Sequence, residues 1–213
     1  MRLPPALVQQ SAPIPIKGIG GGRQGQFVAD AWRGSYNRSE ERLAFFETFV
    51  TNRGHSQFII EGPGISSSIE AKCRMRERVL DLEIVEFTPG PMSYRCEFTA
   101  AAQAIPARFE LQEVRSGLAG ALSRRERRGE IALGGETVQI RSVHKLEGTP
   151  IEMAVPIGYV FEQNGFPVGA VEINGSPRLF FAEATNENLS RTIVTGAIAL
   201  AIFWDPANSA LGD

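Results

Sequence analysis

The sequence has little of the chemistry that metal sites and acid–base catalysis require. Its 213 residues include only two cysteines and two histidines. Zinc sites need Cys and His at short spacing, and magnesium or calcium sites draw heavily on aspartate. The four aspartates are scattered, so we expect no metal and no cofactor; they are Asp30, Asp81, Asp205 and Asp213.

Charge of one sign is also lacking. The chain carries 22 basic and 24 acidic residues, for a net charge of −2. Domains that bind nucleic acid are usually strongly basic. We therefore expect no nucleic-acid partner.

No segment has the length of a membrane span. The apolar run from Ile193 to Trp204 is shorter than the about 20 residues that cross a bilayer, and no cluster of Lys or Arg follows it. The chain start, Met1 to Val8, is interrupted by prolines and lacks the apolar stretch of a signal peptide. We expect a cytoplasmic protein that is not an integral membrane protein, with peripheral association at a membrane as an option.

Motifs for catalysis and nucleotide binding are lacking as well. There is no G-x-S-x-G and no H-E-x-x-H, so His55 and His144 are expected to be ordinary surface or strand histidines. Gly20, Gly22 and Gly25 match G-x-G-x-x-G, but an alternating, strand-like segment follows instead of the helix that a dinucleotide site requires.

The two cysteines could be neighbours on adjacent strands. The chain between Cys73 and Cys96 folds back, in our interpretation, at Pro89-Gly90-Pro91. A disulfide would need a secretory context, which the sequence does not show. We therefore expect two reduced cysteines in the core or on a strand.

What the sequence does contain is alternation of apolar and polar residues. From residue 26 to residue 183 the pattern mostly has period two, as in Ile69–Arg76. Gly134-Gly135, Asn164-Gly165 and Asn174-Gly175 are typical of hairpin turns. The pattern therefore predicts about ten or more short strands.

Two segments are less clear. Glu40 to Asn52 is compatible with a short amphipathic helix or with a pair of strands. Ser116 to Arg128 is interpreted as a loop.

The end of the chain predicts one helix, at about residues 186–204. Thr185 or Asn186 can cap its start, Glu187 suits the positive end of the helix dipole, and Pro206 stops it. Its second half is apolar on every side, which indicates a buried helix. The alternating segments are then expected to close around it.

The predicted fold is mainly β: a closed antiparallel barrel of about twelve strands around a hydrophobic C-terminal helix. Closure removes exposed sheet edges, and a helix fills an interior too wide for side chains alone. We expect a flexible Pro- and Gly-rich tail at residues 1–25, one barrel domain at residues 26–206, and a C-terminal tail at residues 207–213.

The order of the last segments resembles a known superfamily. Gly158–Phe161, Val168–Ile173 and Leu179–Phe181, followed by the apolar helix, resemble the end of the tubby-like superfamily, which includes tubby proteins, LURP-one-related proteins and phospholipid scramblases. The resemblance implies a twelve-stranded barrel around a C-terminal helix. Tubby proteins bind phosphoinositides through basic side chains, so it also implies an anionic lipid as a ligand class.

Two groups of basic residues are candidates for such a ligand. The first is an arginine run with two cations further along the chain, and it is our candidate anion-binding site: Arg124, Arg125, Arg127, Arg128, Arg141 and Lys145. The alternative for this group is a solvated loop. The second group is expected to be an exposed strand face paired with Glu70, Glu83 and Glu97; it comprises Lys72, Arg74, Arg76 and Arg78.

The function that these features favour is non-enzymatic binding, either of a protein partner or of an anionic phospholipid surface. One alternative is a barrel that binds a small apolar ligand in a cavity beside the helix. Another is an enzyme without a recognisable motif.

Overall fold

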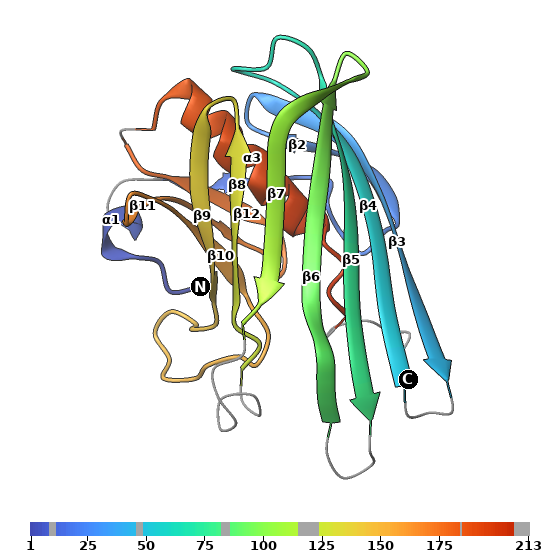
Figure 1. Ribbon diagram of the computed structural model, residues 1–213. Coiled ribbons are helices and arrows are strands. Elements are labelled where there is room, and N and C mark those ends of the chain that lie inside the picture. Colours follow the sequence, from blue (N-terminus) through green and yellow to red (C-terminus); the bar gives the residue numbers. More distant parts are fainter. Residues whose placement is uncertain (9–11, 46–48, 82–85, 115–123, 184, 207–213) are drawn as a thin grey trace.

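The structure is a computed structural model that describes residues 1–8, 12–45, 49–81, 86–114, 124–183 and 185–206. In this part of the chain, twelve antiparallel strands form one sheet that rolls into a nearly closed barrel (Figure 1). The fold class predicted from the alternating pattern is confirmed. The strands are β1 (Ile14–Pro15), β2 (Gln24–Ala29), β3 (Trp32–Phe45), β4 (Phe49–Glu61), β5 (Ile69–Asp81), β6 (Glu86–Ala100), β7 (Gln103–Glu113), β8 (Arg127–Leu133), β9 (Glu136–Val143), β10 (Gly158–Gln163), β11 (Phe166–Glu172) and β12 (Arg178–Phe181).

Strands β2 to β12 pair in chain order, and β1 adds to the far side of β12. The two ends of the sheet meet where the Lys17 N–H donates to the Val28 carbonyl at 2.8 Å and the Val28 N–H donates back at 3.0 Å. Unpaired edge groups are templates for association with other chains. These two hydrogen bonds cover part of the free edge of β2.

Helix α3 (Glu187–Ile202) runs through the middle of the barrel (Figure 1). The Asn186 side chain accepts a hydrogen bond from the Leu189 N–H at 2.8 Å, which confirms a predicted cap. The helix ends two residues before the predicted Trp204, and the Arg38 guanidinium donates to the Ile202 carbonyl at 3.3 Å. The last turn of the helix is therefore completed by a hydrogen bond from a distant residue, whereas the sequence analysis expected Pro206 to end the helix.

The core lies between α3 and the inner face of the sheet. A side chain at Gly196 would bring its Cβ within 3.1 Å of the Phe161 ring, so the helix passes close to β10 there. The described helix residues from Thr192 to Leu200 are almost completely buried. None of the helices in the described ranges combines the length and the apolar character of a membrane span.

The N-terminal segment is folded where it is described, in place of the tail predicted for residues 1–25. Leu7 of α1 (Pro5–Val8) is fully buried in a small cluster with Val160 and Phe180 on the outside of the barrel. The Met1 ammonium group pairs with Glu172 at 2.5 Å. Sequence pattern did not show these contacts, because they depend on residues more than a hundred positions away.

The predicted turns are largely where the sequence placed them. Gly134-Gly135 and Asn164-Gly165 have positive φ at both positions and join β8 to β9 and β10 to β11. The segment 40–52 is a strand pair where it is described, which settles the alternative left open. The turn at Pro89-Gly90-Pro91 was wrong: these residues lie inside β6, where the register with β5 shifts, and such irregularities accommodate proline.

Candidate functional site

The predicted anion-binding site is split by the structure into an outer and an inner part. Arg124, Arg141 and Lys145 line one hollow of about 440 Å³ on the outside of the barrel, together with Arg2. Arg128 is exposed near the start of β8, whereas Arg125 and Arg127 point toward other partners. The six cations therefore do not form one surface.

Each cation in the outer part already has a carboxylate partner. Arg124 and Lys145 share Glu152, at 3.0 and 2.8 Å. Arg141 pairs with Glu162 at 2.9 Å, and Arg128 pairs with Glu126 at 3.1 Å. An incoming anion has to compete with these carboxylates for the cations, so we expect the hollow to have a low affinity for anions.

Arg127 belongs to the core. Its side chain is fully buried, and its guanidinium donates two hydrogen bonds to Asp205, at 2.6 and 2.8 Å, and one to Tyr159 at 3.2 Å. The same group lies over the Phe203 ring, 5.4 Å from its centre. Burial alone would lower the pKa of Arg127, but Tyr159 and Asp205 outweigh burial, and the pKa is raised. Arg127 therefore stays charged and holds the segment after α3.

Arg125 is engaged with acids at the same end of the barrel. It pairs with Glu77 at 3.0 Å and lies 4.0 Å from Glu113. Glu77 also accepts a hydrogen bond from Asn52 at 2.7 Å. Burial raises the pKa of the Glu113 carboxyl, although the charges of Arg125 and Arg127 oppose this. This cluster links β5, β7 and the start of β8.

His144 is buried, whereas we expected an ordinary surface or strand histidine. Its Nε2 lies 3.0 Å from Ser142 Oγ and its Nδ1 lies 2.9 Å from the Met153 carbonyl oxygen. Ser142 Oγ also accepts a hydrogen bond from the Arg127 N–H at 2.9 Å. Burial lowers the pKa of His144. Both ring nitrogens have partners within the protein, so His144 joins Ser142, at the end of β9, to Met153 in the following loop. His55, by contrast, is exposed on β4.

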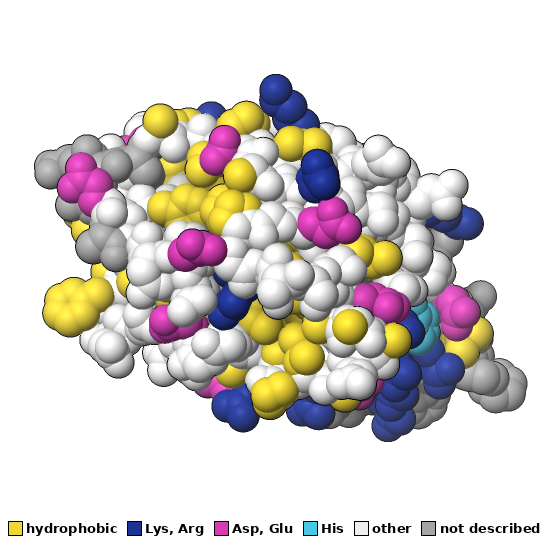
Figure 2. Space-filling model, turned by 90° about the horizontal axis from the view of Figure 1, so that it is seen from above, with side chains coloured by type: hydrophobic (Ala, Val, Ile, Leu, Met, Phe, Trp, Pro, Cys, Tyr) yellow, Lys and Arg dark blue, Asp and Glu magenta, His cyan; other side chains and the backbone are white. Residues whose placement is uncertain are grey.

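Basic side chains are unevenly distributed over the surface. Seen from above, Lys and Arg side chains gather at the lower right of the molecule, beside a histidine, while carboxylates are scattered over the whole view, also next to that histidine (Figure 2). The largest set on neighbouring strands lies on the outer faces of β4, β5 and β6. We call this set the basic face; it comprises Arg53, Lys72, Arg74, Arg76 and Arg95.

The strand register places like charges opposite each other in the basic face. Arg74 of β5 faces Arg95 of β6, and Arg76 of β5 faces Arg53 of β4. Opposed side chains have Cβ atoms about 4.5–5.5 Å apart, and like charges there destabilise the strand pair. Two positive charges about 6 Å apart repel by about 0.7 kcal/mol in water. Four of the cations border a hollow of about 320 Å³ together with Ser93 and Glu97; they are Lys72, Arg74, Arg76 and Arg95.

Carboxylates compensate this face only in part. Lys72 pairs with Glu70 at 3.1 Å and Arg95 pairs with Glu110 at 2.7 Å. Within the described ranges, no ion pair forms at the other three cations, Arg53, Arg74 and Arg76. We expected this strand to be covered by salt bridges, whereas the described residues on its outer face form one, between Lys72 and Glu70.

Part of this surface was visible in the sequence. The alternation of Lys72, Arg74 and Arg76 shows that these cations share one side of a strand. The register that adds Arg53 and Arg95 was not visible, because it depends on which residues of three strands lie side by side. Glu83, one of the expected partners, lies outside the described residues.

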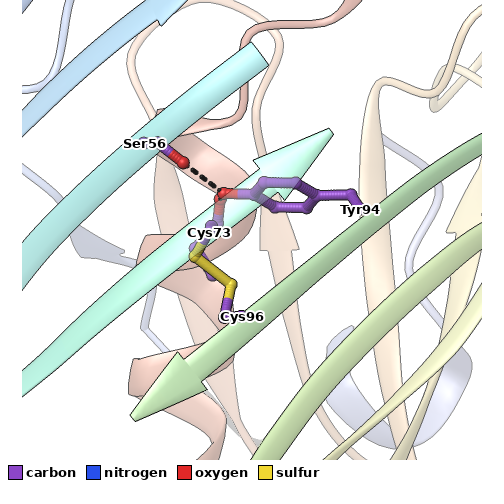
Figure 3. Close-up of a disulfide and its surroundings, with 5 residues drawn as sticks. Ser56, Cys73, Tyr94 and Cys96 are labelled. Carbon is purple, nitrogen blue, oxygen red and sulfur yellow. Dashed lines mark hydrogen bonds between the residues drawn. A yellow bond between two sulfur atoms is a disulfide. The ribbon is translucent and has the colours of Figure 1, made fainter. Parts of the chain in front are cut away.

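The two cysteines form a disulfide directly under this face. Cys73 and Cys96 are register partners in β5 and β6, with an S–S distance of 2.04 Å and a Cα–Cα distance of 4.0 Å. The sulfurs lie on the inner side of the sheet near the Ser56–Tyr94 hydrogen bond of 2.7 Å (Figure 3). The expectation of two reduced cysteines was wrong, because the register brings the pair into direct opposition. Closing a loop of this length stabilises a fold by about 3 kcal/mol.

The structure offers little for a metal ion. In the described part of the chain, no three His, Cys, Asp or Glu side chains converge on a common point. The axis beside α3, where an apolar ligand would have to lie, contains tightly packed side chains near Gly196.

No protein-family model, no curated protein and no solved structure matches the chain. The resemblance to the tubby-like superfamily therefore stays a prediction.

Proposed function

We propose that this barrel is a non-enzymatic binding module that associates with an anionic phospholipid surface through the basic face. The observation that carries the proposal is two pairs of opposed arginines, Arg74 with Arg95 and Arg53 with Arg76. Glu41 lies opposite Arg53 and Glu110 lies opposite Arg95 on the strands at the two sides of this face. Arg74 and Arg76, in the middle strand, have no carboxylate opposite them on either neighbouring strand. A negative surface relieves both repulsions at once.

The expected strength follows from the number of cations without a carboxylate partner. Each basic group near an anionic membrane contributes about 1 kcal/mol. Arg53, Arg74 and Arg76 together then favour anionic over neutral vesicles by about 3 kcal/mol, or roughly 150-fold in affinity. Salt weakens such contacts, because the screening length falls to about 8 Å at physiological ionic strength and to about 3 Å at 1 M.

The proposal moves the binding surface away from the arginine run near β8. There the exposed cations are neutralised by Glu126, Glu152 and Glu162. The disulfide also bears on the compartment in which the protein works. Disulfides persist in oxidising compartments, and those in the cytosol are usually transient and redox-sensing. A cytoplasmic location, as predicted from the sequence, is therefore compatible with this structure if the disulfide can be reduced in the cell.

Co-sedimentation with neutral and anionic vesicles, at low and high salt, tests the proposal. The first variant, Arg74→Gln with Arg76→Gln, should bind anionic vesicles about 30-fold more weakly. The matched control, Arg124→Gln with Arg128→Gln, removes the same charge from paired and exposed positions and should bind like the unaltered protein.

Each other outcome has a clear meaning. Equal loss in both variants would refute the basic face and indicate attraction by total charge alone. Binding to neutral vesicles that persists in high salt would indicate an apolar mechanism. No binding to any vesicle would refute the lipid proposal and leave an acidic protein partner as the better candidate.

A further inference from the structure

The disulfide joins the two strands that carry most of the basic face. Cys73 lies between Lys72 and Arg74 in β5, and Cys96 follows Arg95 in β6. Side chains alternate between the two faces of a strand, so the sulfurs lie inside the barrel and the cations lie outside at the same level. The covalent link is therefore placed where the opposed Arg74 and Arg95 repel each other.

The strand pairing beyond the disulfide is irregular. Between the disulfide and the distal end of the two strands, regular register extends only to Arg76 and Ser93. The register then shifts twice, between Arg76 and Arg78 and between Arg78 and Leu80. Register shifts disrupt the ladder of hydrogen bonds. The distal part of β5 keeps its regular pairing with β4 as far as Leu80, so it is the seam between β5 and β6, residues 74–81 and 86–95, that the disulfide holds closed.

Inner contacts hold the distal part of both strands: Glu77 of β5 accepts a hydrogen bond from Asn52 and pairs with Arg125. Tyr94 of β6 shares a hydrogen bond with Ser56 of β4 and donates one to the Ala199 carbonyl of α3 at 3.1 Å. The side chain of Tyr94 is fully buried. Loss of the disulfide would leave this anchor in place, so the barrel as a whole is expected to stay folded.

We propose that the redox state of Cys73 and Cys96 regulates the basic face: affinity for an anionic surface is high in the disulfide form and lower in the dithiol form. This inference rests on the proposed function. In the disulfide form the spacing of Arg74 and Arg95 is fixed, and their repulsion cannot separate the strands. In the dithiol form the distal strands open locally, and fewer cations meet the surface together.

The chemical step is a two-electron reduction by a dithiol. A thiolate of the reductant attacks one cysteine sulfur, the S–S bond breaks, and a mixed disulfide forms. The second thiol of the reductant then displaces the protein thiolate, so the reductant leaves as a disulfide and both cysteines become protonated thiols. Cys73 and Cys96 are only 3% and 4% exposed. Attack therefore requires local opening of the strands, which a bound anionic surface opposes.

Coupling of this kind is reciprocal. If reduction weakens binding tenfold, anionic vesicles must shift the midpoint potential of the disulfide by about 30 mV toward more reducing values. A tenfold change is what the loss of one to two cations from the surface would produce.

The test measures vesicle binding by the full chain in its oxidised and reduced forms. We expect the dissociation constant for anionic vesicles to rise about tenfold on reduction. The matched control is the Cys73→Ala, Cys96→Ala variant, which should bind like the reduced protein and should not respond to the reductant. Equal binding by the oxidised and reduced forms would overturn the inference while leaving the proposed function intact. Failure of the oxidised protein to bind would overturn both.

Hydrogen exchange separates local opening from unfolding. Reduction should lower protection in residues 74–81 and 86–95 and leave the strands from β8 to β12 unchanged. Loss of protection throughout the barrel would overturn the inference, because the change in binding would then reflect unfolding. A midpoint potential that is the same with and without anionic vesicles would also overturn it.

Discussion

Replacement of Asp205 by asparagine should destabilise the barrel strongly, although the two side chains have nearly the same shape. The substitution removes the carboxylate that accepts two hydrogen bonds from Arg127, at 2.6 and 2.8 Å. The Arg127 side chain is 0% exposed and the Asp205 side chain is 11% exposed. The guanidinium would remain charged inside the protein, with the neutral Tyr159 hydroxyl as a remaining partner.

The magnitude follows from the cost of a buried charge. Removal of one partner of a buried ion pair typically costs about 3–5 kcal/mol. For a chain of this size, 1 kcal/mol corresponds to about 2–4 °C in melting temperature, so the expected decrease is about 6–20 °C. The double variant Arg127→Met, Asp205→Asn removes both charges and should lose much less, because no charge is left buried without its partner.

Urea unfolding of the four proteins in this double-mutant cycle is the appropriate assay. The coupling free energy should be at least about 2 kcal/mol, with similar slopes for all four transitions. The reasoning would be refuted if Asp205→Asn unfolds at the same urea concentration as the unaltered protein. It would also be refuted if the double variant is as unstable as the sum of the single changes.

Two further predictions concern the helix and the buried histidine. Ala199→Asp should prevent folding, because it places an unpaired charge at a fully buried position of α3. Its control, Asn188→Asp at the exposed start of the helix, should fold normally. Soluble yield and melting temperature check both variants, and a stable Ala199→Asp protein would contradict the central position of the helix. The lowered pKa of His144 means that its contribution to stability is present above the unfolded value of about 6.5 and is lost as pH falls through the folded pKa. His144→Asn should therefore give a shallower loss of stability between about pH 7 and about pH 5 than the unaltered protein, and equal slopes would show that this histidine does not titrate differently in the two states.

The elements of the fold could be predicted because each has a local signal. Alternation over Ile69–Arg76 identified a strand with one buried side. Asn164-Gly165, two residue types that tolerate positive φ, identified a hairpin, and both have positive φ in the structure. The apolar run in α3 indicated burial because a helix without a polar side must be enclosed. These signals depend on neighbours within a few positions.

The candidate site could be predicted only in part. The run from Arg124 to Arg128 was interpreted as one loop with one role. Strand β8 begins at Arg127, so alternation turns that side chain inward to Asp205 while Arg128 points outward. Arg125 is directed to Glu77, which is 48 residues earlier in the chain. Local sequence gives the charge of each residue but not the partner that neutralises it.

What the sequence determined by itself was the set of strands, the hairpin turns and the single buried helix, since propensity and periodicity act over short distances. Only the tertiary structure decided which charges face each other. The opposition of Arg74 with Arg95 and the pairing of Cys73 with Cys96 both depend on the register of β5 with β6. A shift of one residue would have turned every one of these side chains to the other face. That register depends on which residues of two separate strands lie side by side, so no short stretch of sequence contains it.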